Sequence, residues 1–546
     1  MSDPTSESGT RRPDWDIVTW SGLVATVALA ITARLVFFTG FFGSDEATYT
    51  NVALVIAKGA LRTSEYVGSL RYGVNLPNAF FLKTLGPSEF SANLWSLLCS
   101  VGEVVLVFVF AHQLWGKRAA FLAAVVIALL PLHVHFGGRL MADAPLAMFI
   151  TLSFLLFWIA EQRQSARWYF GAGLAAGFVF WIKEVVIVYW IAFALYALAY
   201  RIVRLKWVWI GVGAAIAIGA NCVLFAWITG DPLYLVAVIR SHTRKYVVFR
   251  EQIETAPWYY LRYFFADLRH TWLMPYLALA GIGVWAAYAV RKRRIDAGTG
   301  YVVFWAVSLF SVFSFVPISF NPLTLIAKQT NYMLIFVAPF CLLAGYFLAS
   351  LPTLPMIAVL VAYAVGATIL SGLEQQAIRI FTANSKATVE FARTHRDMPV
   401  YAMTNGFRAG GYEDMLRQPG SAKVALSSIS DLFPEPGAAE RESAPSGIRG
   451  YAVVDTQTMS WQPQEPIRKL SEVPPCWGIP TPLEPYPQSG PGYRIAAGIL
   501  EVARSLPAAL SSRLVPAFEA LVRPLPAYVY RVPAKCLPAP ARKGPA

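Results

Sequence analysis

Long runs of apolar residues follow one another along most of the chain and are separated by short polar clusters. A helix of about 20 apolar residues crosses a hydrocarbon core about 30 Å thick, and we distinguish about eleven runs of that kind. The pattern predicts a mainly α-helical, polytopic membrane bundle over residues 17–372. The predicted spans begin near Ile17, Leu94, Ala119, Ala144, Trp168, Val185, Trp207, Trp272, Tyr301, Tyr332 and Met356.

The composition supports this interpretation. Of 546 residues, 56% are hydrophobic and 14% are charged, and the mean hydropathy is +0.49. Soluble domains carry about 25% charged residues, so the composition excludes a soluble, disordered, fibrous or disulfide-dense secreted protein. The formal charge of +14 belongs to loops beside a membrane, and we do not take it as a sign of nucleic-acid binding.

Basic residues recur after every second predicted span. Cytoplasmic loops of membrane proteins carry an excess of Lys and Arg. We therefore expect residues 1–16 to be a cytoplasmic tail in a bacterial inner membrane, and an odd number of spans would place the C-terminus in the periplasm. The clusters are Arg11/Arg12, Lys117/Arg118, Arg163/Arg167, Arg201/Arg204/Lys206 and Arg291–Arg294.

Three regions are predicted to lie outside the membrane, at residues 40–93, 231–271 and 371–546. The first contains the amphipathic stretch Leu76–Leu85, which suits a membrane interface. Residues 373–546 alternate helical and strand-like pieces, so we expect a small extracytoplasmic α/β domain with a disordered Pro-rich end. Cys476 and Cys536 both lie in this tail. An oxidising compartment would allow a disulfide between them, but the sequence leaves the bond open.

Two acidic motifs are the main candidates for chemistry. The first is Gly43-Ser44-Asp45-Glu46, directly after the first span. Carboxylates near a bilayer are costly and often functional. The alternative interpretation is a helix start, with Ser44 as the cap and the acids complementing the helix dipole.

The second motif runs from Arg139 to Pro145 in the next outer loop and contains Asp143. This acid, too, could simply begin a helix that has Pro in its first turn. Both motifs follow spans that end outside. We therefore expect Asp45, Glu46, Asp143 and Arg139 to lie on one face of the membrane.

Further polar residues are predicted to join this outer layer. Lys183-Glu184 follows the fifth span and could alternatively be an interfacial ion pair. Lys328 precedes the tenth span. Arg34 lies inside the first span within snorkelling reach of the outer surface, or it pairs structurally there. His133 and His135 are two residues apart, a spacing that does not place them on one helix face, which disfavours a metal pair.

Signatures of soluble enzymes are absent from the sequence, including phosphate-binding Gly-rich loops, a Gly-x-Ser-x-Gly turn and His-Glu-x-x-His. The polar residues instead suit a cavity at the outer interface with acids and bases around it. Such a cavity would accept an amphipathic substrate.

At this point the sequence resembles the GT-C superfamily of polytopic glycosyltransferases, including aminoarabinose transferases, protein O-mannosyltransferases and rhizobial galacturonosyltransferases. The resemblance covers about residues 17–370. Three positions depart from the family. Asn78 replaces the second of two usual prolines, Asn93 stands where the family usually has Arg, and Asn331 stands where it often has Arg. The stretches that carry the resemblance are Arg34…Ser44-Asp45-Glu46-Ala47-x-Tyr49, Leu76–Phe90, Pro131-Leu132-His133…Arg139-x-x-x-Asp143 and Lys328-x-x-Asn331-Tyr332…Pro339.

The resemblance implies an inverting transferase that takes a sugar from a polyprenyl-phosphate carrier. Asp45 would be the general base for the acceptor hydroxyl. Glu46 would assist or orient Asp45, and Asp143 would hold the acceptor or the sugar hydroxyls. Cations would stabilise the leaving phosphate, and Glu184 and Tyr332 would complete the substrate site. The candidate cations are Lys83, Arg139, Lys183 and Lys328, followed by Arg244 and Lys245.

No nucleotide or redox cofactor is expected, and a divalent ion near the acids is allowed but not required. The expected partners are the lipid-linked sugar donor, membrane lipids, and an envelope acceptor such as lipid A, lipopolysaccharide, another glycan or a protein. Two other functions compete with this one. A transporter or flippase of lipid-linked sugars would also need charged residues in a bundle, usually near the midplane. A non-catalytic scaffold would leave the acidic motifs unexplained.

Overall fold

The structure is a computed structural model that describes residues 15–43, 45–61, 63–64, 66–248, 254–293, 296–403, 405–417, 421–433, 448–460, 465–533 and 536. The chain divides into two compact units. The first comprises Met1–Phe38, Val52–Phe81 and Asn93–Ser371, and the second Thr39–Asn51, Leu82–Ala92 and Gly372–Ala546. The second unit thus combines the tail with two pieces of the first predicted outer loop, a combination that the sequence did not predict.

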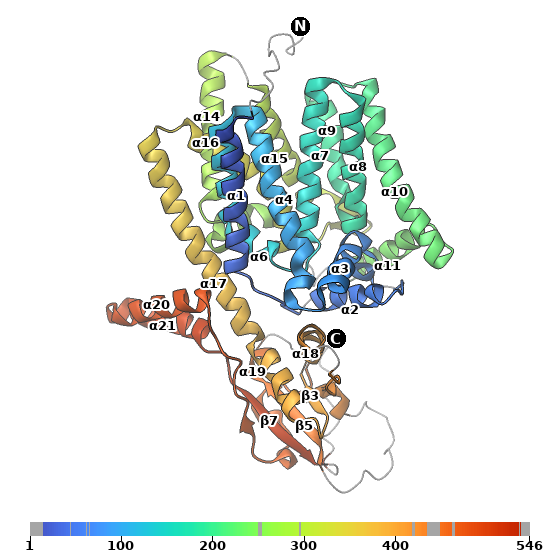
Figure 1. The fold of residues 1–546 in the computed structure, drawn as a ribbon, viewed down its shortest axis with the longest axis vertical. Coiled ribbons are helices and arrows are strands. Elements are labelled where there is room, and N and C mark those ends of the chain that lie inside the picture. The colour runs from blue at the N-terminus through green and yellow to red at the C-terminus, as the bar shows by residue number, and fades with distance from the viewer. Residues whose placement is uncertain are drawn as a thin grey trace. The chain divides into compact units, whose positions relative to one another are not determined.

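Long helices form the bulk of the first unit (Figure 1). In lipid, a helix satisfies every backbone polar group internally, which is why long apolar runs adopt this structure. The long helices are α1 (Ile17–Val36), α4 (Glu89–Trp115), α5 (Lys117–Leu129), α7 (Asp143–Arg163), α8 (Ala166–Ile182), α9 (Ile191–Tyr200), α10 (Val208–Thr229), α14 (Met274–Lys292), α15 (Ala297–Phe315), α16 (Leu334–Ser350) and α17 (Thr353–Thr394).

Shorter elements connect these helices. They are α2 (Asp45–Ala57), α3 (Tyr72–Leu85), α6 (Pro131–Gly137), α11 (Tyr234–Val248), α12 (Tyr259–Ala266), α13 (Leu268–Thr271) and the antiparallel pair β1 (Pro317–Phe320) and β2 (Leu323–Leu325). The amphipathic stretch Leu76–Leu85 lies in α3, where Leu76 and Phe80 are exposed.

Seven helices in the described part of the chain are long and apolar enough to cross a membrane: α1, α4, α7, α15, α17, and α10 and α16 with their leading turns. The helices α5 and α6 are bent by 62° and make an eighth if they count as one span. The protein is therefore mainly helical and crosses the membrane several times. The predicted number of about eleven spans stays a prediction.

Close contact between α8 and α10 depends on glycine. A Cβ atom added at Gly173 would lie 2.0 Å from the carbonyl oxygen of Ile210, and one at Gly213 would lie 2.3 Å from that of Phe170. Small residues let membrane helices approach until their backbones touch, which increases van der Waals contact where no hydrophobic effect drives helices together. Alanine at either position would force the two helices apart.

The basic clusters gather at one end of the first unit. Lys117, at the start of α5, forms a 2.9 Å ion pair with Asp16, which precedes α1. Arg118 donates to the carbonyl oxygen of Leu351 after α16, at 2.7 Å. Where α7 ends, Arg204 pairs with Glu161 at 3.1 Å. Loops that are far apart in sequence therefore share one basic end of the bundle.

The second unit contains a five-stranded mixed sheet of order β4-β3-β5-β7-β6. The strands β3 (Val400–Ala402), β4 (Leu426–Ser428) and β5 (Ile448–Asp455) are parallel, whereas β6 (Thr481–Pro482) and β7 (Ala527–Pro533) pair antiparallel. The same unit contains the helices α18 (Asn405–Leu416), α19 (Thr456–Met459), α20 (Pro491–Ser505) and α21 (Ala508–Val522). Apolar side chains pack on both of its faces.

Helix α17 runs without a break from the last predicted span into the tail. From the sequence we predicted a boundary at residues 371–373, but a lone Gly372 does not end a helix when good helix formers follow it. One helix thus begins in the first unit and ends in the second. The Pro-rich end at residues 537–546 lies outside the described residues.

A disulfide joins Cys476 to Cys536, whose Cα atoms are 6.0 Å apart. It ties the turn Pro475–Trp477 to the chain that follows β7. The adjacent Trp477 is buried and contacts the ring of Tyr530 in β7. The bond that the sequence left open is therefore present and closes one core of the sheet.

We expect Cys476→Ser to lower the free energy of opening the β5–β7 pair by about 2–4 kcal/mol, because the bond restricts the unfolded chain between residues 60 apart. Hydrogen exchange of the β5 and β7 amides in the full protein measures this change. Cys222→Ser removes a thiol without removing a cross-link and should leave the exchange unchanged. Equal protection in Cys476→Ser and the wild-type protein would contradict the prediction.

Candidate functional site

Asp143 is the centre of a buried polar cluster in the first unit. It is the first residue of α7, where the helix dipole favours a carboxylate. Its Oδ1 accepts from Lys183 Nζ at 2.9 Å, and its Oδ2 accepts from Asn331 Nδ2 at 2.9 Å. Each side chain is at least nine-tenths buried. Both oxygens of Asp143 are thus engaged, one by a full positive charge.

Tyr332 completes this cluster. The Lys183 ammonium lies 4.1 Å from the centre of the Tyr332 ring, which is a cation–π contact. Lys183 follows the last residue of α8, and Tyr332 lies in the turn before α16. Three helix ends therefore meet at one ion pair. Asn331, a departure from the related family, is here a direct partner of Asp143.

Glu184 pairs with a residue that is not among the candidates predicted from the sequence. Arg71 donates from Nε and Nη2 to the two carboxylate oxygens of Glu184, both at 3.1 Å. This two-point geometry is the strong form of an Arg–carboxylate bond. Because Lys183 and Glu184 are consecutive, two ion pairs stand side by side along the chain. An Arg in an outer loop beside an amphipathic helix is the sequence signal that could have identified Arg71.

Arg139 is buried at the end of α6. Its Nη1 lies 3.3 Å from His135 Nε2, and its guanidinium lies over the Phe136 ring. The His135 ring is 6.2 Å from that of His270, which contacts Asp267 at 2.8 Å. This polar group extends from α6 to α13.

Lys328 is buried between α15 and α16. Its ammonium donates to the carbonyl oxygens of Phe313 and Ile326, at 2.7 and 2.9 Å. Burial lowers the pKa of Lys328 from its ordinary value of 10.5 to about 8, and the nearby Glu254 opposes this shift only in part. Lys328 is thus a cation whose charge depends on pH near neutrality.

Arg34 does not snorkel to the surface, as one reading of the sequence had it. It is completely buried and donates to Ser100 Oγ, and it contacts His133 Nδ1. His133 Nε2 lies 2.9 Å from Glu103, which also accepts from Thr151 at 2.9 Å. Arg34 therefore belongs to a structural network that ties α1 to α4, α6 and α7. His133 and His135 face different partners, and no cluster of three metal-ligating side chains occurs among the described residues.

The first acidic motif belongs to the second unit. Glu46 is fully buried, and its Oε2 accepts from the backbone N–H of Gly43 at 2.8 Å. Asp45 begins α2 and is half-buried. Of the two acids, Asp45 is therefore the more accessible. Ser44, the alternative helix cap, lies outside the described residues.

Residues of the tail hold this motif in place. Arg408 Nε donates to the carbonyl oxygen of Gly43 at 3.1 Å, and its guanidinium lies over the ring of Phe42. The hydroxyl of Tyr412 donates to the carbonyl oxygen of Phe41. The loop before Asp45 is thus fastened to α18, a contact that no pattern in the sequence predicted.

The remaining predicted cations are exposed. Lys83 lies near the end of α3, and Arg244 and Lys245 lie on α11. Asp45, Glu46 and Lys83 belong to the second unit, whereas Arg139, Asp143, Lys183, Glu184, Lys328 and Tyr332 belong to the first. The structure therefore brings Asp143, Lys183 and Tyr332 together, and their predicted approach to Asp45 stays a prediction.

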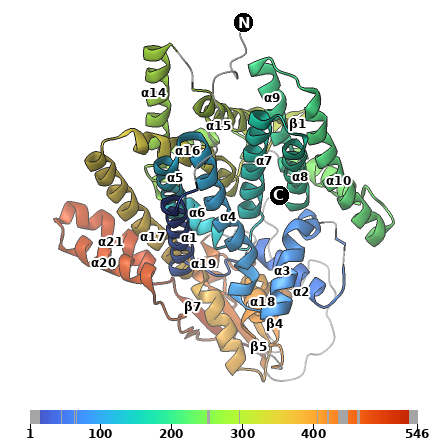
Figure 2. The same ribbon diagram turned by 45° about the horizontal axis from the view of Figure 1, so that its top comes forward.

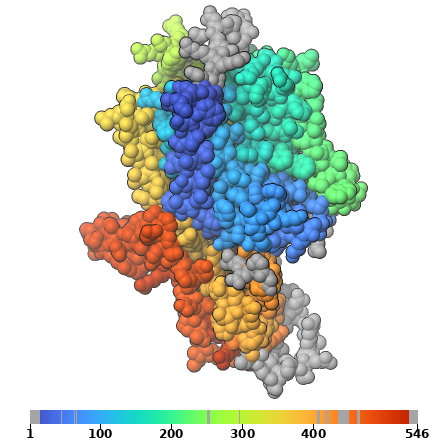
Figure 3. All heavy atoms as spheres, viewed as in Figure 1, coloured from blue at the N-terminus to red at the C-terminus, as the bar shows by residue number. Residues whose placement is uncertain are grey.

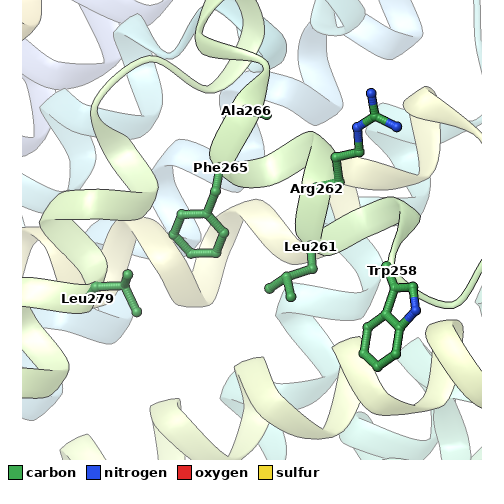
Figure 4. A pocket seen from close by; sticks show the side chains of 6 residues that line it. All are labelled: Trp258, Leu261, Arg262, Phe265, Ala266 and Leu279. Atoms are coloured by element: carbon green, nitrogen blue, oxygen red, sulfur yellow. The ribbon is translucent and has the colours of Figure 1, made fainter.

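An apolar groove of about 580 Å³ opens on the first unit beside α12 and α14 (Figure 4). In Figure 4, Arg262 extends to the side away from Leu279. The groove thus has an apolar floor and a basic residue at its rim. Its lining residues are Trp258, Leu261, Arg262, Phe265, Ala266 and Leu279.

The fold and the buried charges are those of a polytopic membrane protein with a polar cluster at its helix ends, and comparison with known proteins shows what this chain is similar to. A sequence profile of the dolichyl-phosphate-mannose-protein mannosyltransferase family matches residues 75–227. The undecaprenyl phosphate-alpha-4-amino-4-deoxy-L-arabinose arabinosyl transferase of Edwardsiella ictaluri is 25% identical over 329 residues, which are 55% of this chain and 54% of that relative. The match thus spans about half of the relative's length.

Solved structures show the same fold. ArnT from Cupriavidus metallidurans superposes with a TM-score of 0.53 in the apo state and 0.51 when bound to undecaprenyl phosphate, at 17% and 16% identity. Each superposition covers 82% of this chain and 95% of ArnT. The chain therefore has an ArnT-like fold, and the predicted resemblance to polytopic glycosyltransferases is confirmed.

We expect Asp143→Ala to lower the free energy of unfolding by about 3–5 kcal/mol, because it leaves the Lys183 ammonium buried without its counter-charge. The double variant Asp143→Leu/Lys183→Met removes both charges and should lose less. Thermal and denaturant unfolding in nanodiscs gives the comparison. Lys117→Ala breaks an exposed ion pair and should cost less than about 1 kcal/mol. A double variant less stable than Asp143→Ala would contradict the prediction.

Proposed function

We propose that the protein is an inverting glycosyltransferase that moves a sugar from a polyprenyl-phosphate carrier to an acceptor of the cell envelope. The observation that carries the proposal is the buried ion-pair cluster of Asp143, Lys183 and Asn331 at the helix ends of an ArnT-like fold. Asp143 and Lys183 lie inside the stretch that matches the mannosyltransferase profile. A transporter would also need charged residues in its bundle, but the match to the mannosyltransferase profile favours a transferase over a transporter or a scaffold.

In this proposal Asp45 is the general base. It removes the proton of the acceptor hydroxyl while that oxygen attacks C1 of the sugar and the bond from C1 to the phosphate oxygen breaks. Its greater accessibility supports Asp45 over Glu46, whose carboxylate is buried against the Gly43 amide. Glu46 and Arg408 would then hold the loop that presents Asp45.

The leaving phosphate needs cations, and the first unit offers several that are buried. An ammonium has three donors, and Lys183 uses one on Asp143. It can therefore bind a phosphate oxygen without leaving its partner. Arg71 and Arg139 are further candidates, because both are largely buried in the same unit and a guanidinium can contact phosphate at two points.

The donor lipid fits the apolar surface of the first unit. Ligand sites of about 300–1,000 Å³ with an apolar lining and few polar groups are typical of small-molecule recognition. The groove beside α12 and α14 has this size, and Arg262 at its rim suits a phosphate. The solved ArnT complex contains undecaprenyl phosphate, and we propose a carrier of the same class here.

We propose about eleven spans, formed by α1, α4, α5, α7, α8, α9, α10, α14, α15, α16 and α17. The shared basic end of the first unit supports a cytoplasmic N-terminus in an inner membrane. The sheet unit that follows α17 would then be periplasmic. We also propose that the reaction needs no nucleotide or redox cofactor, and that a divalent ion is at most an accessory near the acids.

Asp45→Asn is expected to lower the rate of sugar transfer by about 10²-fold or more, because a positioned base contributes at least that factor. The assay uses the purified protein in nanodiscs with a polyprenyl-phosphate sugar and an envelope extract as acceptor. Asp431→Asn makes the same chemical change at an exposed acid of the tail and should leave the rate unchanged. Wild-type turnover by Asp45→Asn would remove Asp45 as the base.

The transfer rate should also fall as the pH rises through about 8, where Lys328 loses its proton. Unfolding responds with the opposite sign. The unfolded lysine keeps its proton up to about 10.5, so the free energy of unfolding should rise between pH 8 and 10.5. A pH profile of kcat in wild type and Lys328→Arg measures the first effect, because arginine stays protonated. An alkaline limb at the same pH in both proteins would contradict the assignment.

A further inference from the structure

Helices α20 and α21 form an antiparallel hairpin in the second unit. They pack against each other and project away from the sheet of their unit (Figures 1 and 2). A 2.7 Å ion pair between Arg504 and Glu519 links the two helices. The hairpin is therefore a packed element of its own. The roles described above for the sheet and for the first acidic motif do not account for its presence.

The base of the hairpin is fixed to α17. The backbone N–H of Gly492 donates to Gln375 Oε1 at 3.1 Å, and Gln376 Nε2 donates to the carbonyl oxygen of Leu521 at 2.9 Å. A Cβ atom at Gly492 would lie 2.5 Å from the carbonyl oxygen of Gly372. The first turn of α20 thus touches the α17 backbone itself.

These contacts lie just after the apolar part of α17, a helix that is long and apolar enough to cross a membrane. Its apolar run extends to Leu370, with Val361, Val365 and Ile369 exposed as for a lipid-facing side. Polar residues begin at Ser371 and include Glu374, Gln375 and Gln376. The hairpin is therefore attached within two helical turns of the hydrocarbon boundary, at the depth of the lipid headgroups.

The surface of the hairpin suits that depth. Val502, Leu510 and Leu514 are exposed on it, and Leu525 is exposed just beyond it. Residues 491–523 contain four arginines and two glutamates and no other charged residue. Apolar side chains next to basic ones are the pattern of helices that lie in an interface of anionic lipids. The hairpin stands out as a red ridge in Figure 3.

We propose that the α20–α21 hairpin lies in the headgroup layer of the membrane that α17 crosses and binds anionic phospholipids. Leu510 and Leu514 enter the layer between headgroups and acyl chains, and Arg494 and Arg513 contact lipid phosphates. The hairpin thereby gives the sheet unit a second attachment to the bilayer beside α17. This inference does not depend on the glycosyltransferase proposal.

The test uses the full-length protein with an environment-sensitive nitrobenzoxadiazole label on Leu510→Cys. The background variant is Cys222→Ser, because Cys99 and Cys341 are buried and Cys222 is the partly exposed thiol of the three unpaired cysteines. Ser430→Cys, at an exposed position beside the sheet, is the matched control. The protein is placed singly into nanodiscs of phosphatidylcholine, with or without phosphatidylglycerol, and with lipids spin-labelled near the headgroup.

The expected result is blue-shifted emission at position 510 that spin-labelled lipid quenches, and unshifted, unquenched emission at position 430. Phosphatidylglycerol should increase the quenched fraction at position 510. Arg494→Gln and Arg513→Gln should each reduce the ratio of bound to unbound hairpin about fivefold in that lipid, since a basic residue near an anionic surface contributes about that factor.

Three results would overturn the proposal. Equal, unquenched emission at positions 510 and 430 would mean that the hairpin is in water. A blue shift without lipid quenching would mean that protein covers it. A quenched fraction that is the same with and without phosphatidylglycerol, and the same in both arginine variants, would exclude recognition of anionic lipid. A label on Leu514→Cys repeats the measurement if Leu510→Cys fails to fold.

Discussion

Compensation of buried charge is the constraint on which the first unit depends. An ionised side chain between membrane helices is costly unless an opposite charge and hydrogen-bond partners lie next to it. Asp143 has Lys183 and Asn331, and Glu184 has Arg71. Because the partners lie at or beside the ends of different helices, each pair also holds those ends together. The charged cluster therefore has a structural role in holding helix ends together, in addition to its proposed role in the site.

This structural role limits how the charged cluster can take part in the proposed chemistry. Lys183 meets a substrate as a cation already bound to Asp143, so its charge is positioned in advance. Groups fixed before the substrate arrives need not reorganise when negative charge develops on a leaving phosphate. A partly neutralised cation attracts an anion less strongly, and several such cations are then needed. The presence of Arg71, Arg139 and Lys328 in the same unit agrees with that need.

The two acidic motifs depend on different parts of the chain. Asp143 is held by membrane helices, whereas the loop before Asp45 is held by Arg408 and Tyr412 of the tail. The tail is therefore part of the support for the first motif and more than an appendage. Helix α17 contributes to this support, because the ring of its Phe381 stacks on that of Phe42 in the same loop.

The sequence by itself determined the membrane class, the helical content and the resemblance to polytopic glycosyltransferases. Each of these follows from local features: apolar runs of spanning length, and motifs contained in short stretches. It also identified Asp143 and Lys183 as candidates, since charges at span ends are conspicuous in an apolar chain.

Only the tertiary structure decided the partners. It joined Asn331 to Asp143 across 188 residues and Arg71 to Glu184 across 113, buried Arg34 against His133, and fastened residues 39–51 to the tail. No local pattern encodes such pairs, because helix packing brings together segments whose order along the chain says nothing about which ends meet. The sequence showed that each buried charge needs a counter-charge. Only the packing of the helices showed which residue supplies it.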